Sequence, residues 1–261
     1  MPTTFAHDLF GAEVFKQAAA PVQKLVLSNK NLYRIGLHGP DVLFYYFLWV
    51  NKVNQYGVRL HKEAARGFFE NNLAKARAQK NEALLSYLCG FACHLVLDST
   101  CHPYIYSIER EVSHGEIEKE LDRYLMLREG KDPFHYYPAE VLTVRRKDCR
   151  VMQEAFEGVS ARQIAFALKG MKNVTKAMVY TDNEVRRQTI FLLLKLTGAY
   201  DKLAGNFMKK ECDPALLPYL QKVLDLFETA VKRAPDIIEA VYRSYESAAP
   251  LPDYFDRNYN E

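Results

Sequence analysis

Hydrophobic residues recur at spacings of three and four along almost every long segment of the chain, which is the period of an amphipathic helix. Between His61 and Gln79, Ala65, Phe69 and Leu73 share one stripe and charged residues lie opposite, which predicts a single surface-packed helix. The hairpin-forming dipeptides Asn-Gly and Asp-Gly are absent, and the chain has only 12 glycines and 11 prolines. The pattern therefore predicts an all-α fold.

Prolines and apolar stripes set the bounds of the other predicted helices. Pro103 is expected to end a helix at about His102, and Pro235 is expected to separate the last two helices. The late leucine-rich stripes are expected to pack in the core rather than on a membrane, and they contain Leu192, Leu193, Leu194, Leu196, Leu220, Val223, Leu224 and Phe227. The predicted ranges are 83–97, 114–128, 147–157, 160–180, 183–199, 215–233 and 236–247.

The composition adds an expectation about domains but little about partners. The chain has 261 residues, 49% of them hydrophobic, which is enough for a sizeable core. We expect one domain over 1–261, with a metal-binding half at 1–130, a packing half at 131–250 and a tail at 251–261. A formal net charge of +3 does not indicate a surface that coats nucleic acid, so nucleic acid is expected only as a possible substrate. Nothing in the sequence indicates the oligomeric state.

The N-terminal residues lack the basic and apolar regions of a secretion signal. The longest apolar run, Val42–Val50, is far shorter than a membrane span. We therefore expect a cytoplasmic protein without a transmembrane segment. The five cysteines are an odd number and are scattered, so reduced thiols are expected.

Polar side chains interrupt the segment 83–97 and its continuation, which is otherwise apolar on all sides. His94 and Asp98 are four residues apart and project from one face of this helix, and His102 continues the same step. An ionised carboxylate in such a setting costs several kcal/mol unless it is paired or bound to a cation. A metal ion is the simplest compensation.

A second pair of donors follows at the start of the next predicted helix. Ser113 and Glu116 form a capping-box pattern, so a helix should begin there. His114 lies in its first turn, and Glu118 follows four residues later on the same face. Nitrogen and oxygen donors without cysteine favour catalytic over structural zinc.

The two clusters together read His-x3-Asp-x3-His-x11-His-x3-Glu. This pattern resembles the zinc-dependent phospholipase C family, whose fold and metal site are shared by single-strand-specific zinc nucleases, and the resemblance covers roughly residues 1–120. Upstream, Pro40-Asp41, His61 and His7 match the remaining ligand positions of that family. The metal ligands that the resemblance implies are His7, Asp41, His61, His94, Asp98, His102, His114 and Glu118.

The resemblance implies two to three zinc ions per chain. The first would be held by Asp41, His61, His94 and Asp98, and the second by His102, His114 and Glu118. The third would take His7, share Asp98 as a bridging carboxylate and use a main-chain group near the N-terminus. Secreted members use their processed first residue, a Trp, for that group, whereas this chain starts with Met1-Pro2. Val42 stands where choline-hydrolysing members are expected to carry an aromatic residue, so choline specificity is not indicated.

The implied activity is hydrolysis of a phosphodiester, either a phospholipid head group or another soluble compound. Zinc lowers the pKa of a bound water to near ~7, so that hydroxide can attack the phosphorus. Asp41 is the candidate general base, although it could equally be only a ligand. Aromatic residues near the ligands could line a substrate pocket, namely Phe44, Tyr45, Tyr46, Tyr104 and Tyr106.

Other interpretations stay open at this point. A single-strand nuclease or 3′-nucleotidase would use the same ligands, and a helical protein could also bind metal without catalysis. Asp41 could instead cap a helix, and His61 and His7 could be exposed polar residues. His38 is expected in a turn and His135 on the surface.

Overall fold

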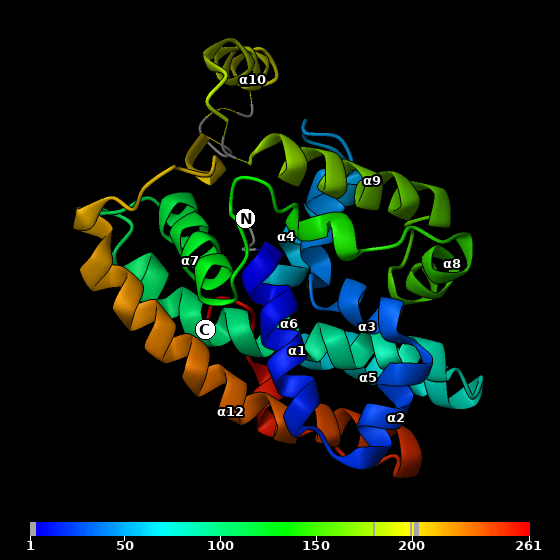
Figure 1. The fold of residues 1–261 in the computed structure, drawn as a ribbon. Coiled ribbons are helices and arrows are strands. Elements are labelled where there is room, and N and C mark those ends of the chain that lie inside the picture. Colours follow the sequence, from blue (N-terminus) through cyan, green and yellow to red (C-terminus); the bar gives the residue numbers. More distant parts are fainter. Residues whose placement is uncertain (1–3, 180, 199, 201–203) are drawn as a thin grey trace.

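The computed structural model describes residues 4–179, 181–198, 200 and 204–261, and these form helices joined by loops with no strand among them (Figure 1). The all-α prediction is confirmed. The α-helices are α1 Thr4–Gln17, α2 Ala20–Ser28, α3 Lys30–Gly36, α4 Lys52–Lys62, α5 Ala65–Ala78, α6 Glu82–Ser107, α7 His114–Arg128, α8 Arg146–Ala155, α9 Ala161–Ala177, α10 Glu184–Leu196 and α12 Leu217–Ser247. The short 3₁₀ helices are η1 Gly39–Tyr45, η2 Pro138–Val141, η3 Ala204–Asn206, η4 Pro214–Leu216 and η5 Asp253–Asp256.

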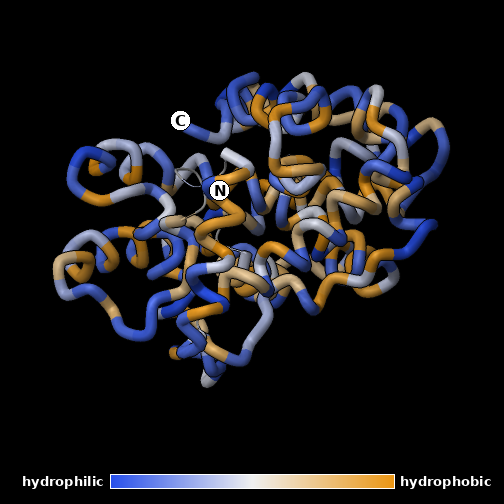
Figure 2. Tube along the Cα trace, turned by 90° about the horizontal axis from the view of Figure 1, so that it is seen from above, coloured by the Kyte–Doolittle hydropathy of each residue, from blue (hydrophilic) through white to orange (hydrophobic). Residues whose placement is uncertain are grey.

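Helix α6 runs through the middle of the molecule, and α1, α3, α5, α7 and α12 pack around it (Figure 1). Nearly every residue of α6 from Leu84 to Ile105 is buried, which accounts for its apolar character on all sides. Along the surrounding helices, hydrophobic and hydrophilic positions alternate (Figure 2). Among the described residues, α6 alone is long and apolar enough to cross a membrane, but 94% of its most apolar window is buried inside the molecule. Here α6 is a core helix.

Two glycines let α3 approach α6 closely. A Cβ atom on Gly36 would lie 2.3 Å from the carbonyl oxygen of Tyr87, and a Cβ on Gly90 would lie 2.1 Å from that of Tyr33. Such contacts are far shorter than van der Waals packing permits, so both positions require glycine. The close approach brings the segment that follows α3 against the polar residues of α6.

The single helix predicted over 61–79 is wrong, because the structure breaks it into α4 and α5. Glu63 and Ala64 adopt extended conformations between the two helices. The C-terminal tail supplies partners for the backbone groups at this break. The Ala65 N–H donates to the Arg257 carbonyl, and the Tyr259 N–H donates to the His61 carbonyl. The distant tail therefore stabilises a break that the local pattern does not reveal.

Both predicted proline stops are also wrong. Helix α6 continues through Pro103 to Ser107, and α12 continues through Pro235 to Ser247. A proline removes only one intrahelical hydrogen bond, and buried residues on both sides can outweigh that loss. Ile105 is buried beyond Pro103, and Ile238 is buried beyond Pro235.

Helix α10 departs from the core prediction. It stands apart from the rest of the ribbon in Figure 1. Leu194 packs with Met178 and Phe207 in a small separate cluster. In contrast, Leu192, Leu193 and Leu196 are exposed rather than buried. The predicted core stripe is confirmed on α12, whose buried residues include Leu220, Val223, Leu224 and Phe227. The predicted helix ends at residues 180 and 199 lie outside the described residues.

Candidate metal centre

The structure brings together all eight side chains that the sequence singled out as ligands. They come from five elements: α1 supplies His7, η1 supplies Asp41, α4 supplies His61, α6 supplies His94, Asp98 and His102, and α7 supplies His114 and Glu118. Although these residues span more than a hundred positions of sequence, their side chains form two neighbouring clusters beside one cleft.

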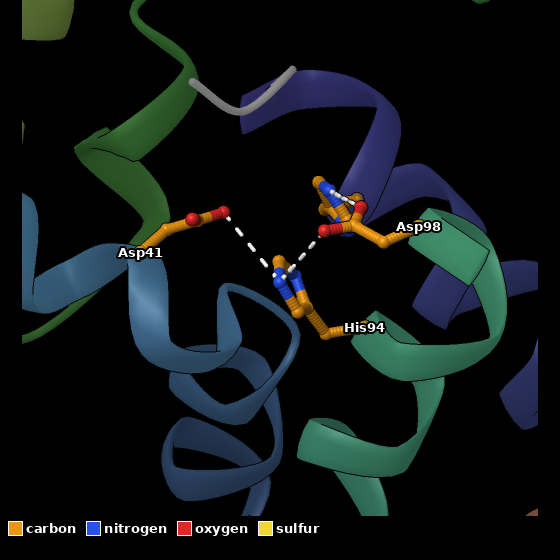
Figure 3. Close-up of side chains that lie close together, drawn as sticks. Asp41, His94 and Asp98 are labelled. Atoms are coloured by element: carbon orange, nitrogen blue, oxygen red, sulfur yellow. Dashed lines mark ion pairs between the residues drawn. The ribbon is translucent and has the colours of Figure 1, made fainter. Parts of the chain in front are cut away.

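The first cluster is centred on His94, which lies between two carboxylates (Figure 3). The His94 Nε2 atom is 3.6 Å from Asp41 Oδ2 and 3.1 Å from Asp98 Oδ2. On the other side of Asp41, the His61 Nε2 atom is 3.0 Å from Oδ1. Asp41, His94 and Asp98, together with His7, offer donor atoms within 4.8 Å of one another, whereas His61 joins this group through its contact with Asp41.

Asp98 also faces His7 through its second oxygen. The His7 Nε2 atom is 3.2 Å from Asp98 Oδ1, whereas Oδ2 faces His94. The His7 and His94 rings are stacked with centroids 4.5 Å apart. The two oxygens of Asp98 therefore face two different imidazoles.

The second cluster joins the end of α6 to the start of α7. Glu118 Oε1 lies 3.5 Å from His102 Nε2 and 3.0 Å from His114 Nε2. The predicted cap of α7 holds this arrangement, because the Ser113 hydroxyl accepts from the Glu116 N–H and begins the helix at His114. The i, i+4 pair predicted from the sequence therefore forms.

Four of the five imidazoles are anchored through Nδ1, which leaves Nε2 aimed at a carboxylate. The Nδ1 atoms contact Gly57 O in His61 (2.7 Å), Leu37 O in His94 (3.2 Å), Tyr259 O in His102 (2.9 Å) and Glu109 Oε1 in His114 (3.0 Å). A carbonyl or carboxylate can only accept, so Nδ1 carries a proton, and in the neutral ring Nε2 then offers its lone pair to a metal ion. Metal-binding histidines in proteins are oriented in this way.

The buried charges influence one another strongly. Burial favours the neutral acid, yet His94 and His102 hold the pKa of the Asp98 carboxyl well below its usual range. Burial also opposes the charged form of His102, but Asp98 and Glu118 outweigh it and raise the pKa of that imidazole to about 9. The same balance against Asp98 raises the pKa of His7. Buried carboxylates that remain ionised attract protons or cations to this place.

Both sequence neighbours of His7 are fixed to other elements. The Ala6 N–H donates to Asp122 Oδ1 at 2.9 Å, which ties α1 to α7. Arg34 of α3 donates to both oxygens of Asp8, at 2.9 and 2.8 Å. His7 thus has little freedom to swing away from Asp98.

Gly39 allows η1 to lie against the His94 ring. Its φ of +48° is in the left-handed region, and a Cβ atom there would lie 2.2 Å from His94 Cδ2. Two residues later, Asp41 is then close enough to face both His94 and His61. The close packing of Gly39 therefore positions the Asp41 carboxylate in the cluster, and a role as a helix cap is not needed to explain this residue.

The C-terminal tail completes the site, and this is the part that the sequence analysis missed. Tyr259 is buried and its carbonyl accepts from His102, while Asn260 lines the cleft. Asn260 Nδ2 also donates to the His61 carbonyl at 3.1 Å. No spacing or motif links the tail with helices more than 150 residues away, so no local signal could have revealed it.

A cleft of ≈ 210 Å³ opens at the two clusters. Of the five aromatic residues considered for a pocket, Phe44 and Tyr106 line this cleft. The prediction is wrong for the other three, since Tyr45 is buried and Tyr46 and Tyr104 pack against the core. Val58 and Lys62 of α4 also line the cleft.

Two further histidines lie outside the clusters. His38 occupies the turn between α3 and η1, as expected, but it is fully buried. Burial, together with the nearby His7 and His94, lowers the pKa of His38 to about 3. His135 is exposed, as expected, and contacts Asp132.

The family of the chain follows from its match to a model of a known protein family. The model of the family described as zinc dependent phospholipase C matches residues 1–167. The chain belongs to the zinc-dependent phospholipase C family. The match confirms the predicted resemblance, extends it to the middle of α9 and includes all eight converging side chains. No curated protein and no solved structure matches this family member.

The residues present fit the zinc ions that the family implies. His7, Asp41, His94 and Asp98 offer donor atoms within 4.8 Å of one another, and so do His102, His114 and Glu118. Imidazole nitrogens and carboxylate oxygens suit zinc. The buried Nε2 atom of His94 lies between the Asp41 and Asp98 carboxylates but makes no hydrogen bond of good geometry with either, as expected of an atom that binds a metal ion.

Proposed function

We propose that the chain is a zinc-dependent phosphodiester hydrolase of the phospholipase C type that uses two to three zinc ions. The observation that carries the proposal is a set of four imidazoles, listed above, whose Nδ1 atoms are held by hydrogen bonds while their Nε2 atoms face carboxylates. One ion would be held by Asp41, His61, His94 and Asp98, a second by His102, His114 and Glu118, and a third by His7 and Asp98. The main-chain group expected to help the third ion lies outside the described residues.

Bound zinc would supply hydroxide at neutral pH and positive charge against the phosphoryl oxygens. The protein's own contribution is to fix the geometry. Asp98 contacts both His7 and His94 and so fixes the position of one ring relative to the other. The Tyr259 carbonyl in the C-terminal tail fixes His102. Both oxygens of Asp41 already face imidazoles, which supports a role as ligand more than as general base.

The cleft suits one phosphoryl group with a modest substituent. Its ligands lie at the base, and Phe44, Tyr106 and Lys62 are available to contact a head group. An aromatic face can bind a cationic head group, and a lysine can bind a phosphate oxygen. We therefore place a phospholipid head group, or another small phosphodiester, in this cleft. The cytoplasmic location expected from the sequence stays a prediction.

The test combines metal content with hydrolysis. The purified protein is expected to cleave a chromogenic soluble phosphodiester and to lose this activity with a chelator, with recovery on addition of zinc. Asp98→Asn should abolish cleavage, whereas His135→Gln, at an exposed histidine outside the clusters, should not change it. Preferential cleavage of single-stranded DNA would favour the nuclease alternative. Tightly bound zinc without cleavage of any phosphoester would favour the non-catalytic one.

A further inference from the structure

A group of exposed aromatic and aliphatic side chains lies beside the cleft, and the metal centre does not use it. We name it the aromatic rim; it consists of Phe47, Leu48, Trp49, Val50 and Phe166. Trp49 is 57% exposed, Val50 67% and Phe166 45%. Apolar side chains of this size that face water together usually mark a binding surface.

Ring contacts make the rim one continuous surface from two distant segments. The Phe47 ring stacks on Trp49 with centroids 4.4 Å apart and contacts Phe166 of α9 at 4.5 Å. Phe47 has a φ of +56°, a left-handed conformation that a phenylalanine rarely adopts. Strain of this kind persists where the surrounding structure enforces it, and here it holds Leu48, Trp49 and Val50 toward solvent.

The rim is connected to the cleft through one face of α4. The Trp49 carbonyl accepts from Asn54 Nδ2 at 2.8 Å. Val58 follows Asn54 by one turn and lines the cleft, and Lys62 follows Val58 by another turn and also lines it. A surface that touches the rim is therefore next to the opening of the metal centre.

The two segments that form the rim carry only basic charged side chains, although Arg59 and Lys172 lie near Glu63 and Glu140 of adjoining segments. The sequence contains no acidic residue between Asp41 and Glu63, and none between Glu157 and Asp182. These two segments hold seven basic residues, namely Lys52, Arg59, Lys62, Arg162, Lys169, Lys172 and Lys176. Because the whole chain has a net charge of only +3, the rest of the molecule is net negative. On α9, Arg162 and Lys169 flank Phe166 on the exposed face.

We propose that the aromatic rim docks the protein on the surface of an anionic lipid bilayer and presents the cleft to head groups. This inference rests on the proposed function for its purpose, but the docking can be measured without catalysis. Tryptophan at the level of the head groups, aliphatic side chains below it and basic residues around it are the features of an interfacial binding surface. An anionic bilayer offers an apolar interior to the aromatic and aliphatic side chains of the rim and negative charge to the basic residues around it.

Trp49 is the only tryptophan of the chain, so its fluorescence reports on the rim alone. The zinc-loaded protein is mixed with vesicles of phosphatidylcholine plus phosphatidylglycerol, or of phosphatidylcholine only. We expect a blue shift of emission and co-sedimentation with the anionic vesicles, weakened by salt. Absence of both with anionic vesicles would overturn the proposal.

Two matched variants test whether the rim itself is responsible. Val50→Asp keeps the Trp49 reporter and should weaken vesicle binding by about tenfold or more, because a charged side chain resists transfer into the interface. Leu27→Asp is the control, since Leu27 is 64% exposed but lies on α2, at the opposite end of the ribbon from α9 in Figure 1. Equal binding by both variants would show that another surface docks.

The remaining outcomes are also decisive. A blue shift that depends on protein concentration in the absence of vesicles, with a dimer in analytical ultracentrifugation, would assign the rim to a second copy of the chain instead. Vesicle binding without cleavage of any phosphodiester would leave the docking proposal standing while the proposed function fails. Zinc content measured for each variant shows that the substitutions leave the metal centre intact.

Discussion

Asp98 links His7 to His94 in the first cluster, because one of its oxygens faces each imidazole. Asp98→Asn should therefore lose more than one zinc ion per chain. Glu118→Gln should lose only one, since Glu118 faces His102 and His114 within a single cluster. Plasma mass spectrometry of the purified variants counts the ions. Equal losses of one ion in both variants would refute the bridging role of Asp98.

The proton on His102 gives a second prediction at the residue scale. Its pKa in the metal-free protein is about 9, above the usual value near ~6.5, so the imidazole is protonated at pH 7. Zinc needs the neutral ring, and binding at pH 7 should therefore release protons. Calorimetry in two buffers of different protonation enthalpy measures the number. His102→Asn should release about one proton fewer, and binding enthalpies that do not depend on the buffer would contradict the assignment.

The residues of the site were more predictable than their anchors. Donor types at helical spacing identified His94, Asp98, His102, His114 and Glu118, because both partners of each pair lie within one or two turns of the chain. The groups that fix the rings, such as the Tyr259 and Leu37 carbonyls, are main-chain atoms from other elements. A carbonyl has no sequence signature, so only the fold reveals these contacts.

At the scale of elements, the approach of η1 to α6 depends on Gly39. Gly39→Ala should lower zinc content and destabilise the protein by about 1–3 kcal/mol, because the new Cβ would overlap the His94 ring. Gly67→Ala is the matched control. Gly67 lies in α5 with open space around it, so alanine there should be neutral or stabilise by up to about 1 kcal/mol. Urea denaturation and zinc analysis distinguish the two, and a well-folded, zinc-replete Gly39→Ala would contradict the packing argument.

Helix existence followed from the sequence, whereas several boundaries did not. The hydrophobic spacing identified α6, α7, α8, α9 and α12, since each buries a stripe against the core. The breaks were misplaced where distant contacts decide the outcome. The tail stabilises the interruption between α4 and α5, and continuous burial carries α12 through Pro235. On α10, the leucine spacing correctly indicated a helix but not which leucines would be buried.

At the scale of the whole molecule, the chain closes on itself through its last residues. Phe255 and Tyr259 are buried, and the segment around them joins α4, α5 and α6. A chain that ends at Arg257 should lose about 3–5 kcal/mol of stability through loss of the buried Tyr259 ring, and its affinity for zinc should fall. Removal of Glu261 alone is the control, because that residue is exposed. Equal thermal stability and zinc affinity in both truncated chains would contradict a structural role for the tail.

The central claim is that the two buried clusters hold metal ions, and counting zinc in the tag-free purified protein by plasma mass spectrometry tests it most directly. The account predicts two to three zinc ions per chain, lost together with thermal stability on treatment with a chelator and regained on addition of zinc. A folded protein that contains no zinc and takes none up when zinc is added would contradict it.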